Sequence, residues 1–296
     1  MNDSSQPITL RQQDASAEIV LLGGELRRWS IGTHELLWNA DPLWWPRSSP
    51  VLFPIVGRLR GGQTRVNGQG YAMGIHGFAA AQPFQLRSMQ TDQVTLGLAS
   101  NAATRAMYPF DFDLGLRYRL HRDSLEIELR VSNLGAEPMP FAIGLHPGLR
   151  WPFSAASAGG HAVVFDQPES PRVPVISVEG LFCAQQRTLD MAPRRLGLDP
   201  SPIGSDALCF LHAHSRRLRF ESPDGAAIEL TASNFEHWAL WNKPGAPFLC
   251  IEAWTGHGDP VDFDGEFADK PSMRQLAPLA SSEHGLRLRF EGPSKP

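Results

Sequence analysis

Two neighbouring segments with strict two-residue alternation constrain the fold of this chain more than any other feature. Apolar residues occupy every second position on both sides of a turn near Arg122-Asp123, at Leu116, Tyr118, Leu120, Leu125, Ile127, Leu129 and Val131. Because side chains alternate between the faces of a strand, this pattern predicts an antiparallel hairpin. Pairing Leu120 with Leu125 brings opposite charges together as Arg119–Glu126 and Arg117–Glu128. One face is then apolar, and the other is charge-matched and solvated.

Short strand-like segments and turn signals continue along the rest of the chain. The apolar run 19–22 leads through Gly23-Gly24 into a second extended stretch, and Asp224-Gly225 predicts another hairpin turn. The only segment that fits a short helix is 101–108, which Pro109 would end. No repeat or change of composition marks a boundary. The sequence therefore predicts an all-β sandwich or barrel with very little helix, in a single domain spanning 1–296.

The composition limits the classes of partner. The chain has 296 residues, of which 42% are hydrophobic and 20% charged, as in soluble globular proteins. Its net charge of −4 gives no basic surface for nucleic acid or an anionic membrane, and no apolar run is long enough to span a membrane. The polar start, residues 1–6, lacks a signal-peptide core. Three cysteines without a close pair, Cys183, Cys209 and Cys250, fit reduced thiols, so we expect a cytoplasmic protein.

One apolar segment near the carboxyl end contains a single carboxylate. Residues 247–254 read PFLCIEAW, and in extended conformation one face carries Phe248, Cys250, Glu252 and Trp254. Burial of Glu252 is costly unless the carboxyl group is hydrogen-bonded, neutral or functional. The residues alone leave two interpretations open: a structural glutamate held by backbone donors or an arginine, and a functional acid.

Other candidate residues are dispersed along the chain. Arg58 ends an irregular stretch rich in Pro, Trp and Gly, and His76 lies between Gly74 and Gly77. Glycines permit backbone shapes that could present this histidine at a cleft, although an exposed turn histidine fits equally. His146 ends an apolar strand because Pro147 cannot continue a ladder, and it could be purely structural. Another strand-like run begins with the acid Asp206.

Several standard sites are missing from the sequence. It contains no nucleophile elbow, no Walker loop and no cysteine–histidine cluster with zinc spacing. His212-Ala213-His214 would place two imidazoles on one face of a strand, but no third metal ligand stands at motif spacing, so we expect exposed histidines. A carboxylate, an imidazole and aromatic walls remain, and these suit a neutral sugar.

Five segments, in order and rough spacing, resemble the aldose 1-epimerase (galactose mutarotase-like) family. They are 49–59, 75–78, 144–147, 206–208 and 248–254, and residues 104–110 resemble the family's threonine and Tyr-Pro-Phe segment. The resemblance covers the chain from about Ile19 to Phe290. It looks closest to the bacterial branch with a Cys-Ile-Glu-Pro-Trp signature, in which Ala253 here replaces the proline. That replacement leaves the acid itself in place.

The resemblance implies a large antiparallel β-sandwich with an open cleft, the galactose mutarotase-like supersandwich. It implies an isomerase of carbohydrate metabolism that interconverts the α and β anomers of free hexoses, with Glu252 as general base and His146 as general acid. Arg58, His76 and Asp206 would then bind sugar hydroxyls. This chemistry requires no cofactor, metal or covalent nucleophile.

Three alternatives stay open at this point. A hexose-6-phosphate mutarotase would need a cationic pocket, for which Arg47, Arg60 and Arg105 are available. A non-catalytic sugar-binding module on the same fold would need no acid–base pair. A glycoside hydrolase would need two carboxylates flanking the bond, which Glu252 and Asp206 could supply.

Overall fold

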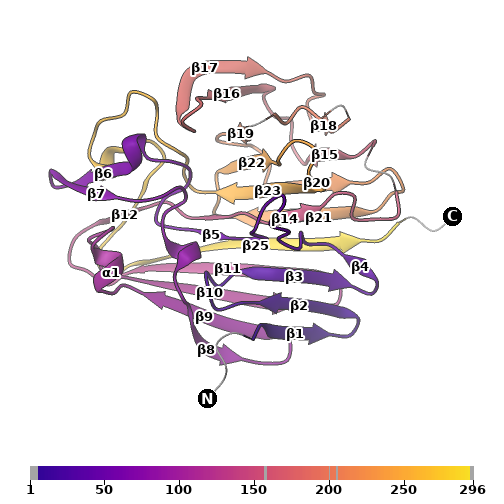
Figure 1. The fold of residues 1–296 in the computed structure, drawn as a ribbon, viewed down its shortest axis with the longest axis horizontal. Coiled ribbons are helices and arrows are strands. Elements are labelled where there is room, and N and C mark those ends of the chain that lie inside the picture. The colour runs from indigo at the N-terminus through magenta and orange to yellow at the C-terminus, as the bar shows by residue number, and fades with distance from the viewer. Residues whose placement is uncertain (1–5, 157–158, 200, 205, 294–296) are drawn as a thin grey trace.

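Antiparallel strands make up nearly all of the regular structure (Figure 1). The structure is a computed structural model that describes residues 6–156, 159–199, 201–204 and 206–293. Most of the polar start of the chain, residues 1–5, therefore lies outside the described part. The all-β prediction is confirmed, and every pair of named strands in the described ranges is antiparallel.

Three larger sheets form the body of the molecule. The nine-stranded sheet has the order β18 (Arg195–Gly197), β15 (Ala162–Phe165), β20 (Arg217–Glu221), β21 (Ala227–Ser233), β25 (Ser281–Glu291), β11 (Ser124–Asn133), β10 (Phe112–Leu120), β9 (Gln93–Ala99) and β8 (Gln85–Met89). The four-stranded sheet has the order β1 (Ile8–Gln12), β2 (Ala15–Ile19), β3 (Leu26–Ile31) and β4 (His34–Glu35).

The six-stranded sheet is central to the site. Its order is β19 (Leu208–Phe210), β22 (His237–Trp241), β23 (Phe248–Trp254), β13 (Gly144–Leu145) and β5 (Val51–Leu52), with β14 (Gly148–Arg150) also paired to β23. Three two-stranded ribbons complete the strands: β12 (Met139–Phe141) with β24 (Arg274–Leu276), β16 (Arg172–Ile176) with β17 (Phe182–Thr188), and β6 (Gln63–Val66) with β7 (Gln69–Ala72).

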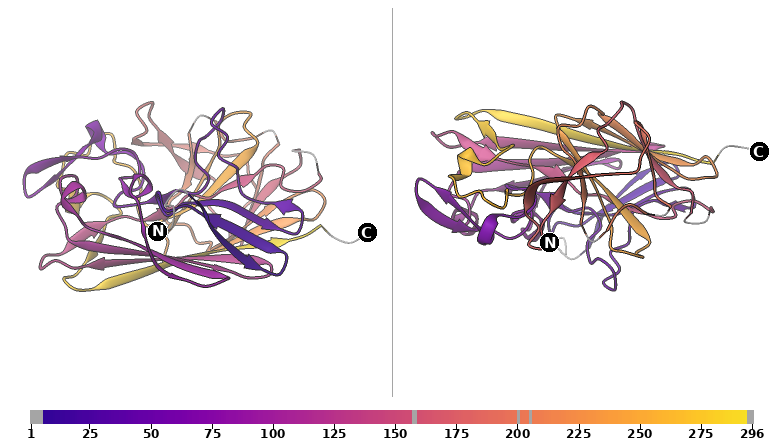
Figure 2. Two further views of the ribbon diagram at one scale, coloured as in Figure 1. Left: turned by 60° about the horizontal axis from the view of Figure 1, so that its bottom comes forward. Right: turned by 90° about the horizontal axis from the view of Figure 1, so that it is seen from above.

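The sheets are layered, as the rotated views show (Figure 2). One large cluster of buried apolar side chains joins them, with Leu10 from the four-stranded sheet, Leu114 from the nine-stranded sheet and Ile251 from the six-stranded sheet. Burial of these residues between layers is the main source of stability of such a sandwich. The β6–β7 and β16–β17 ribbons lie at the edges of the layers (Figure 1).

The predicted hairpin is confirmed in its register. Strands β10 and β11 pair Leu120 with Leu125, and the charged pairs follow as Arg119–Glu126 and Arg117–Glu128. All of its predicted apolar positions are buried. On the other face Arg117 and Glu128 form an ion pair. The alternation of the sequence therefore fixed both the register and the buried face.

Helices are short throughout the described residues. They are α1 (Ala102–Arg105) and the 3₁₀ turns η1 (Arg60–Gly62), η2 (Ala79–Ala81) and η3 (Phe267–Asp269). Helix α1 is shorter than the expected 101–108. Asn101 caps it and accepts from the backbone N–H groups of Ala103 and Thr104, and the chain then turns so that Tyr108 is buried and donates to the Pro140 carbonyl. None of the described helices is long and apolar enough to cross a membrane.

Candidate active site

Strand β23 presents its two faces to different surroundings. Leu249, Ile251 and Ala253 point into the main core, and the opposite face carries Phe248, Cys250, Glu252 and Trp254. This is the division that the two-residue period predicts. Glu252 is only 1% exposed, although its face borders a cavity of about 610 Å³. The carboxylate is thus buried at the wall of a space that a ligand could enter.

The sheet register places His146 directly beside this carboxylate. Strand β13 pairs Leu145 with Ala253, and β14 pairs Gly148 with Cys250. The His146-Pro147 step between these two short strands therefore lies opposite Glu252 and Ile251. Pro147 interrupts the ladder as expected, and its carbonyl accepts from the Ile251 N–H at 3.2 Å. His146 Nε2 lies 3.2 Å from Glu252 Oε1.

Glu252 has a second polar contact and an altered acidity. The indole N–H of Trp254, two residues along the same face, donates to Oε2 at 3.0 Å. Burial raises the pKa of Glu252 well above its usual value, and the bond from Trp254 opposes this shift only in part. The carboxylate is therefore a stronger base than one in water, and its side chain is held in one orientation.

His146 is enclosed by three rings. The Trp45 indole stacks on it with centroids 5.0 Å apart, and Trp241 and His76 meet it edge-on at 5.9 Å and 5.6 Å. Burial lowers the pKa of His146 well below its usual value, and the nearby His76 adds to this effect. An imidazolium at this position is therefore a stronger acid than one in water.

A backbone hydrogen bond sets the tautomer of the His76 ring. Its own φ is +62°, in the left-handed region, and its Nδ1 accepts from the Gly57 N–H at 3.1 Å. Burial, aided by the charge of Arg58, lowers the pKa of His76 to about 4. The ring is thus neutral near pH 7 with its proton on Nε2, where it can donate to a ligand.

All five residues singled out from the sequence line the same cavity. They are Arg58, His76, His146, Asp206 and Glu252. The six-stranded sheet gathers most of them, because Asp206 precedes β19, His146 follows β13 and Glu252 lies on β23. Arg58 packs against Gly180 in the β16–β17 turn, where a Cβ atom would lie 2.7 Å from Arg58 Cδ. Gly180 has φ +80°, so both the backbone and the space favour glycine there.

Sequence reasoning missed other residues of the cavity wall. Trp45, Trp241, Trp254 and Lys243 line it as well, and so does Arg47, which was considered only for a phosphate. The irregular stretch 41–62, noted for its prolines and tryptophans, was the only signal for Trp45. Nothing in the sequence distinguishes Trp45 from Trp44, which does not line this cavity.

The loop after β23, residues 255–275, is tied down beside the site. The buried Lys270 ammonium contacts Asp259 Oδ1 at 2.7 Å and the His257 carbonyl at 2.6 Å. Asp259 also accepts from the Arg60 N–H through Oδ2 at 2.8 Å, and its own N–H donates to the Arg58 carbonyl at 2.8 Å. The loop therefore fixes the backbone that follows the Arg58 side chain.

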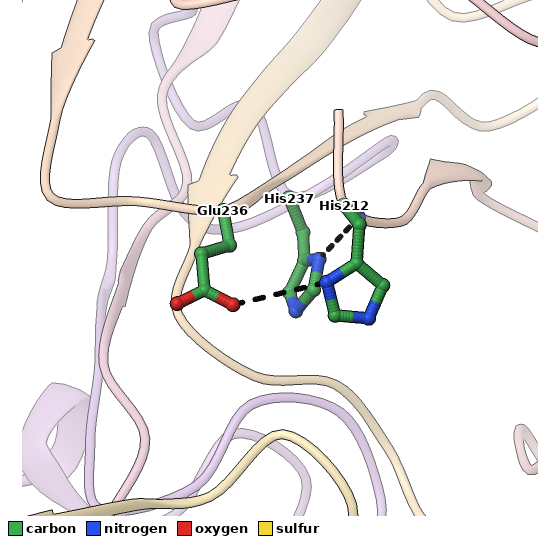
Figure 3. Close-up of side chains that lie close together, drawn as sticks. All are labelled: His212, Glu236 and His237. Carbon is green, nitrogen blue, oxygen red and sulfur yellow. Dashed lines mark hydrogen bonds and ion pairs between the residues drawn. The ribbon is translucent and has the colours of Figure 1, made fainter. Parts of the chain in front are cut away.

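His212 and His214 lie outside the cavity and are exposed, as expected, but they are not on one strand face. Strand β19 ends at Phe210 and His212 adopts φ +51°, so His212 and His214 do not share a strand face. His212 instead lies near Glu236 and His237 (Figure 3). His237 Nδ1 accepts from the His212 N–H at 2.9 Å, which leaves the proton of the neutral ring on Nε2. Glu236 is also paired with Arg274 at 3.0 Å, and this ion pair competes with a metal ion for the carboxylate.

Comparison with solved structures defines the class of fold. A galactose mutarotase related enzyme from Lactobacillus acidophilus matches with a TM-score of 0.89 and 25% identity, over 98% of this chain and 99% of that one. A galactose mutarotase-like protein from Lactobacillus casei matches with a TM-score of 0.88 and 24% identity, over 96% of this chain and 100% of that one. The fold is therefore galactose mutarotase-like, as the resemblance implied.

Sequence comparison then gives the family. The sequence profile of the aldose 1-epimerase family matches residues 6–270. The chromosomal protein LacX of Lactococcus lactis is 30% identical over 290 residues, which cover 93% of this chain and 96% of LacX. The chain belongs to the aldose 1-epimerase family.

Proposed function

We propose that this protein is an aldose 1-epimerase that interconverts the α and β anomers of free hexoses. The observation that carries the proposal is the buried pair of Glu252 and His146, 3.2 Å apart at the wall of a cavity. A carboxylate and an imidazole in contact can remove one proton and deliver another in the same reaction. Membership in the aldose 1-epimerase family supports this chemistry.

In the proposed mechanism Glu252 takes the proton of the C1 hydroxyl while His146 Nε2 gives a proton to the ring oxygen. The C1–O5 bond breaks, its electron pair goes to O5, and a C1 carbonyl forms. Rotation about C1–C2 presents the other carbonyl face, and reclosure reverses both transfers. The two sugar oxygens are bonded to the same carbon, so adjacent acid and base groups can reach both of them.

The acidities of the pair suit these transfers. Burial raises the pKa of Glu252 and lowers that of His146, so it disfavours the carboxylate and the imidazolium alike. One proton passed from Glu252 to His146 across their 3.2 Å contact gives the carboxylate–imidazolium pair that the mechanism uses, and in that pair the base and the acid are each stronger than in water. Groups of this kind typically supply roughly 10²–10⁴ in rate each.

The remaining sequence-predicted residues fit recognition of hydroxyl groups. Arg58 supplies N–H donors, neutral His76 offers its Nε2–H, and Asp206 supplies carboxylate acceptors. All three line the cavity that contains the acid–base pair. Because a sugar hydroxyl both donates and accepts, this mixture suits a neutral sugar, and we assign the three residues to substrate binding.

A phosphorylated substrate has less support. Of the three arginines considered for a phosphate, Arg47 lines the cavity but is paired with buried Glu25. Arg60 lines a neighbouring groove, and Arg105 is paired with Asp111 beside a third one. These arginines do not converge on one point, so we favour the free sugar as substrate.

Polarimetry of freshly dissolved α-D-glucose and α-D-galactose tests the proposal. We expect wild-type protein to speed the approach to the equilibrium rotation and Glu252→Gln to lose most of that effect. Glu128→Gln, a matched change on the solvated face of the β10–β11 hairpin, should behave as wild type.

Glucose 6-phosphate is measured in parallel with a coupled assay. If the protein accelerated only the mutarotation of the phosphate ester, it would be a hexose-6-phosphate mutarotase. Sugar binding without acceleration would favour a binding module. Release of a sugar from an aryl glycoside would point to a hydrolase.

A further inference from the structure

We propose that Trp45 is a positioning residue for the acid His146, and that it acts on turnover more than on sugar affinity. The inference rests on the proposed role of His146 as the acid. No specific role for this tryptophan follows from the sequence alone.

The first observation is how little else orients the imidazole. His146 Nε2 faces Glu252, while its Nδ1 is buried without a hydrogen-bond partner among the described residues. A sugar placed for reaction takes over the contacts between acid and base, so the Nε2–Glu252 contact is shared with the substrate. Contacts with neighbouring rings then hold the plane of the imidazole. Among these rings, the Trp45 indole stacks on the imidazole, at an interplanar angle of 30°.

The second observation is that the indole of Trp45 is itself held by packing. Phe248 stacks with it at 5.5 Å, and Trp241 meets it edge-on at 5.5 Å. Gly148, two residues after His146, makes room for it, because a Cβ atom there would lie 2.9 Å from the indole. The ring is therefore packed between the imidazole and the strand pair that bears the acid and the base.

The third observation is that the backbone of the Trp45 loop is anchored at Trp45 and at the residues that follow it. The Trp45 carbonyl accepts from the Trp38 indole N–H at 2.9 Å. Buried Glu25 accepts from the N–H groups of Ser48 and Ser49 at 2.6 Å and 3.2 Å. The Ser48 carbonyl in turn accepts from the Gly148 N–H at 2.7 Å. The loop is thus joined to the strand that follows the acid.

The chain offers a matched control for the test. Trp44 is the neighbouring residue of the same loop and is partly buried against the same aromatic cluster, but it neither lines the cavity nor stacks on His146. We compare Trp45→Leu, Trp45→Phe and Trp44→Leu by polarimetry, with kcat and KM determined separately and thermal melts to verify folding.

We expect Trp45→Leu to lower kcat by about tenfold or more, since small misplacements of a reacting group can cost up to ~10²-fold. KM should change by less than kcat. Trp45→Phe should recover most of kcat, because it restores a ring face, and Trp44→Leu should match wild type. If Trp45→Leu raised KM more than it lowered kcat, Trp45 would be a platform for the sugar and the inference would be wrong. Equal losses in Trp44→Leu and Trp45→Leu would also overturn it.

A measurement without substrate separates this inference from the proposed function. In histidine-labelled protein, NMR signals of the His146 ring, assigned with His146→Asn, should be displaced by the ring current of Trp45. The displacement should disappear in Trp45→Leu and persist in Trp44→Leu. If wild-type protein failed to accelerate mutarotation, the proposed function would fall, and the NMR result alone would decide whether Trp45 orients His146. Unchanged His146 signals in Trp45→Leu would refute the positioning role.

Discussion

Two pairs of this protein each join a basic side chain to a glutamate, but their surroundings differ. Arg117 and Glu128 lie opposite each other on β10 and β11, with side chains 44% and 47% exposed. His146, directly after β13, lies opposite Glu252 on β23, and their side chains are 8% and 2% exposed. Water screens the first pair and leaves it a solvated surface contact. Exclusion of water moves the pKa values of the second pair, so burial, not pairing, distinguishes the pair that we propose as acid and base from the surface pair.

A double-mutant cycle on the buried pair tests most directly whether its two members act together. Glu252→Gln and His146→Asn should each reduce kcat by roughly 10²–10⁴, because each removes one proton transfer. The double variant should be little worse than the more damaging single one, since acid and base act as a unit. Polarimetry of all four proteins measures this coupling, and simple multiplication of the two losses would contradict it.

Removal of Arg58 should act on binding. Arg58→Ala deletes charged donors from the cavity wall but leaves the Glu252–His146 pair in place. We expect KM to rise by roughly ten- to 150-fold, because hydrogen bonds to charged groups contribute roughly 1.5–3 kcal/mol. The rate at saturation should fall less. Steady-state kinetics with galactose measures both, and an unchanged KM would remove Arg58 from the sugar site.

A third prediction concerns how the stability of the folded protein depends on pH, and it follows from a buried histidine. Burial is the main reason that the pKa of His237 is lowered to about 3, whereas an exposed histidine titrates near ~6.5. Between these values the unfolded chain binds more protons, so the free energy of unfolding should fall as the pH decreases from about 6.5 towards 3. His237→Asn keeps an acceptor for the His212 N–H and should flatten this dependence. Thermal melts at several pH values test it, and an equal slope in both proteins would contradict it.

The smallest effect is expected at the solvated pair. Arg117→Ala and Glu128→Gln should each change the free energy of unfolding by no more than ~1 kcal/mol, because both partners are half exposed.

Because one core cluster joins all three large sheets, we also propose that the chain is one domain and unfolds in a single transition. Urea unfolding monitored by fluorescence and circular dichroism tests both statements. Separate transitions for the two probes would contradict the single domain.

The sequence by itself determined what depends on neighbours along the chain. Two-residue alternation and a short turn set the register of the β10–β11 hairpin, since a slip by one residue would expose its whole apolar face. The same period determined that Glu252 shares a face with Trp254 on β23. Ordered motifs also indicated Arg58, His76, His146 and Asp206, although none of these positions follows from alternation alone.

Only the tertiary structure decided which of these residues meet. Leu145 pairs with Ala253 across more than a hundred residues, and this register brings His146 to Glu252. Local preferences carry no information about such a pairing, because many registers between distant strands satisfy the same alternation. The same holds for Trp45, whose loop is placed by buried Glu25 and by the space above Gly148. The proposed chemistry therefore depends on long-range packing of residues that lie far apart in the sequence.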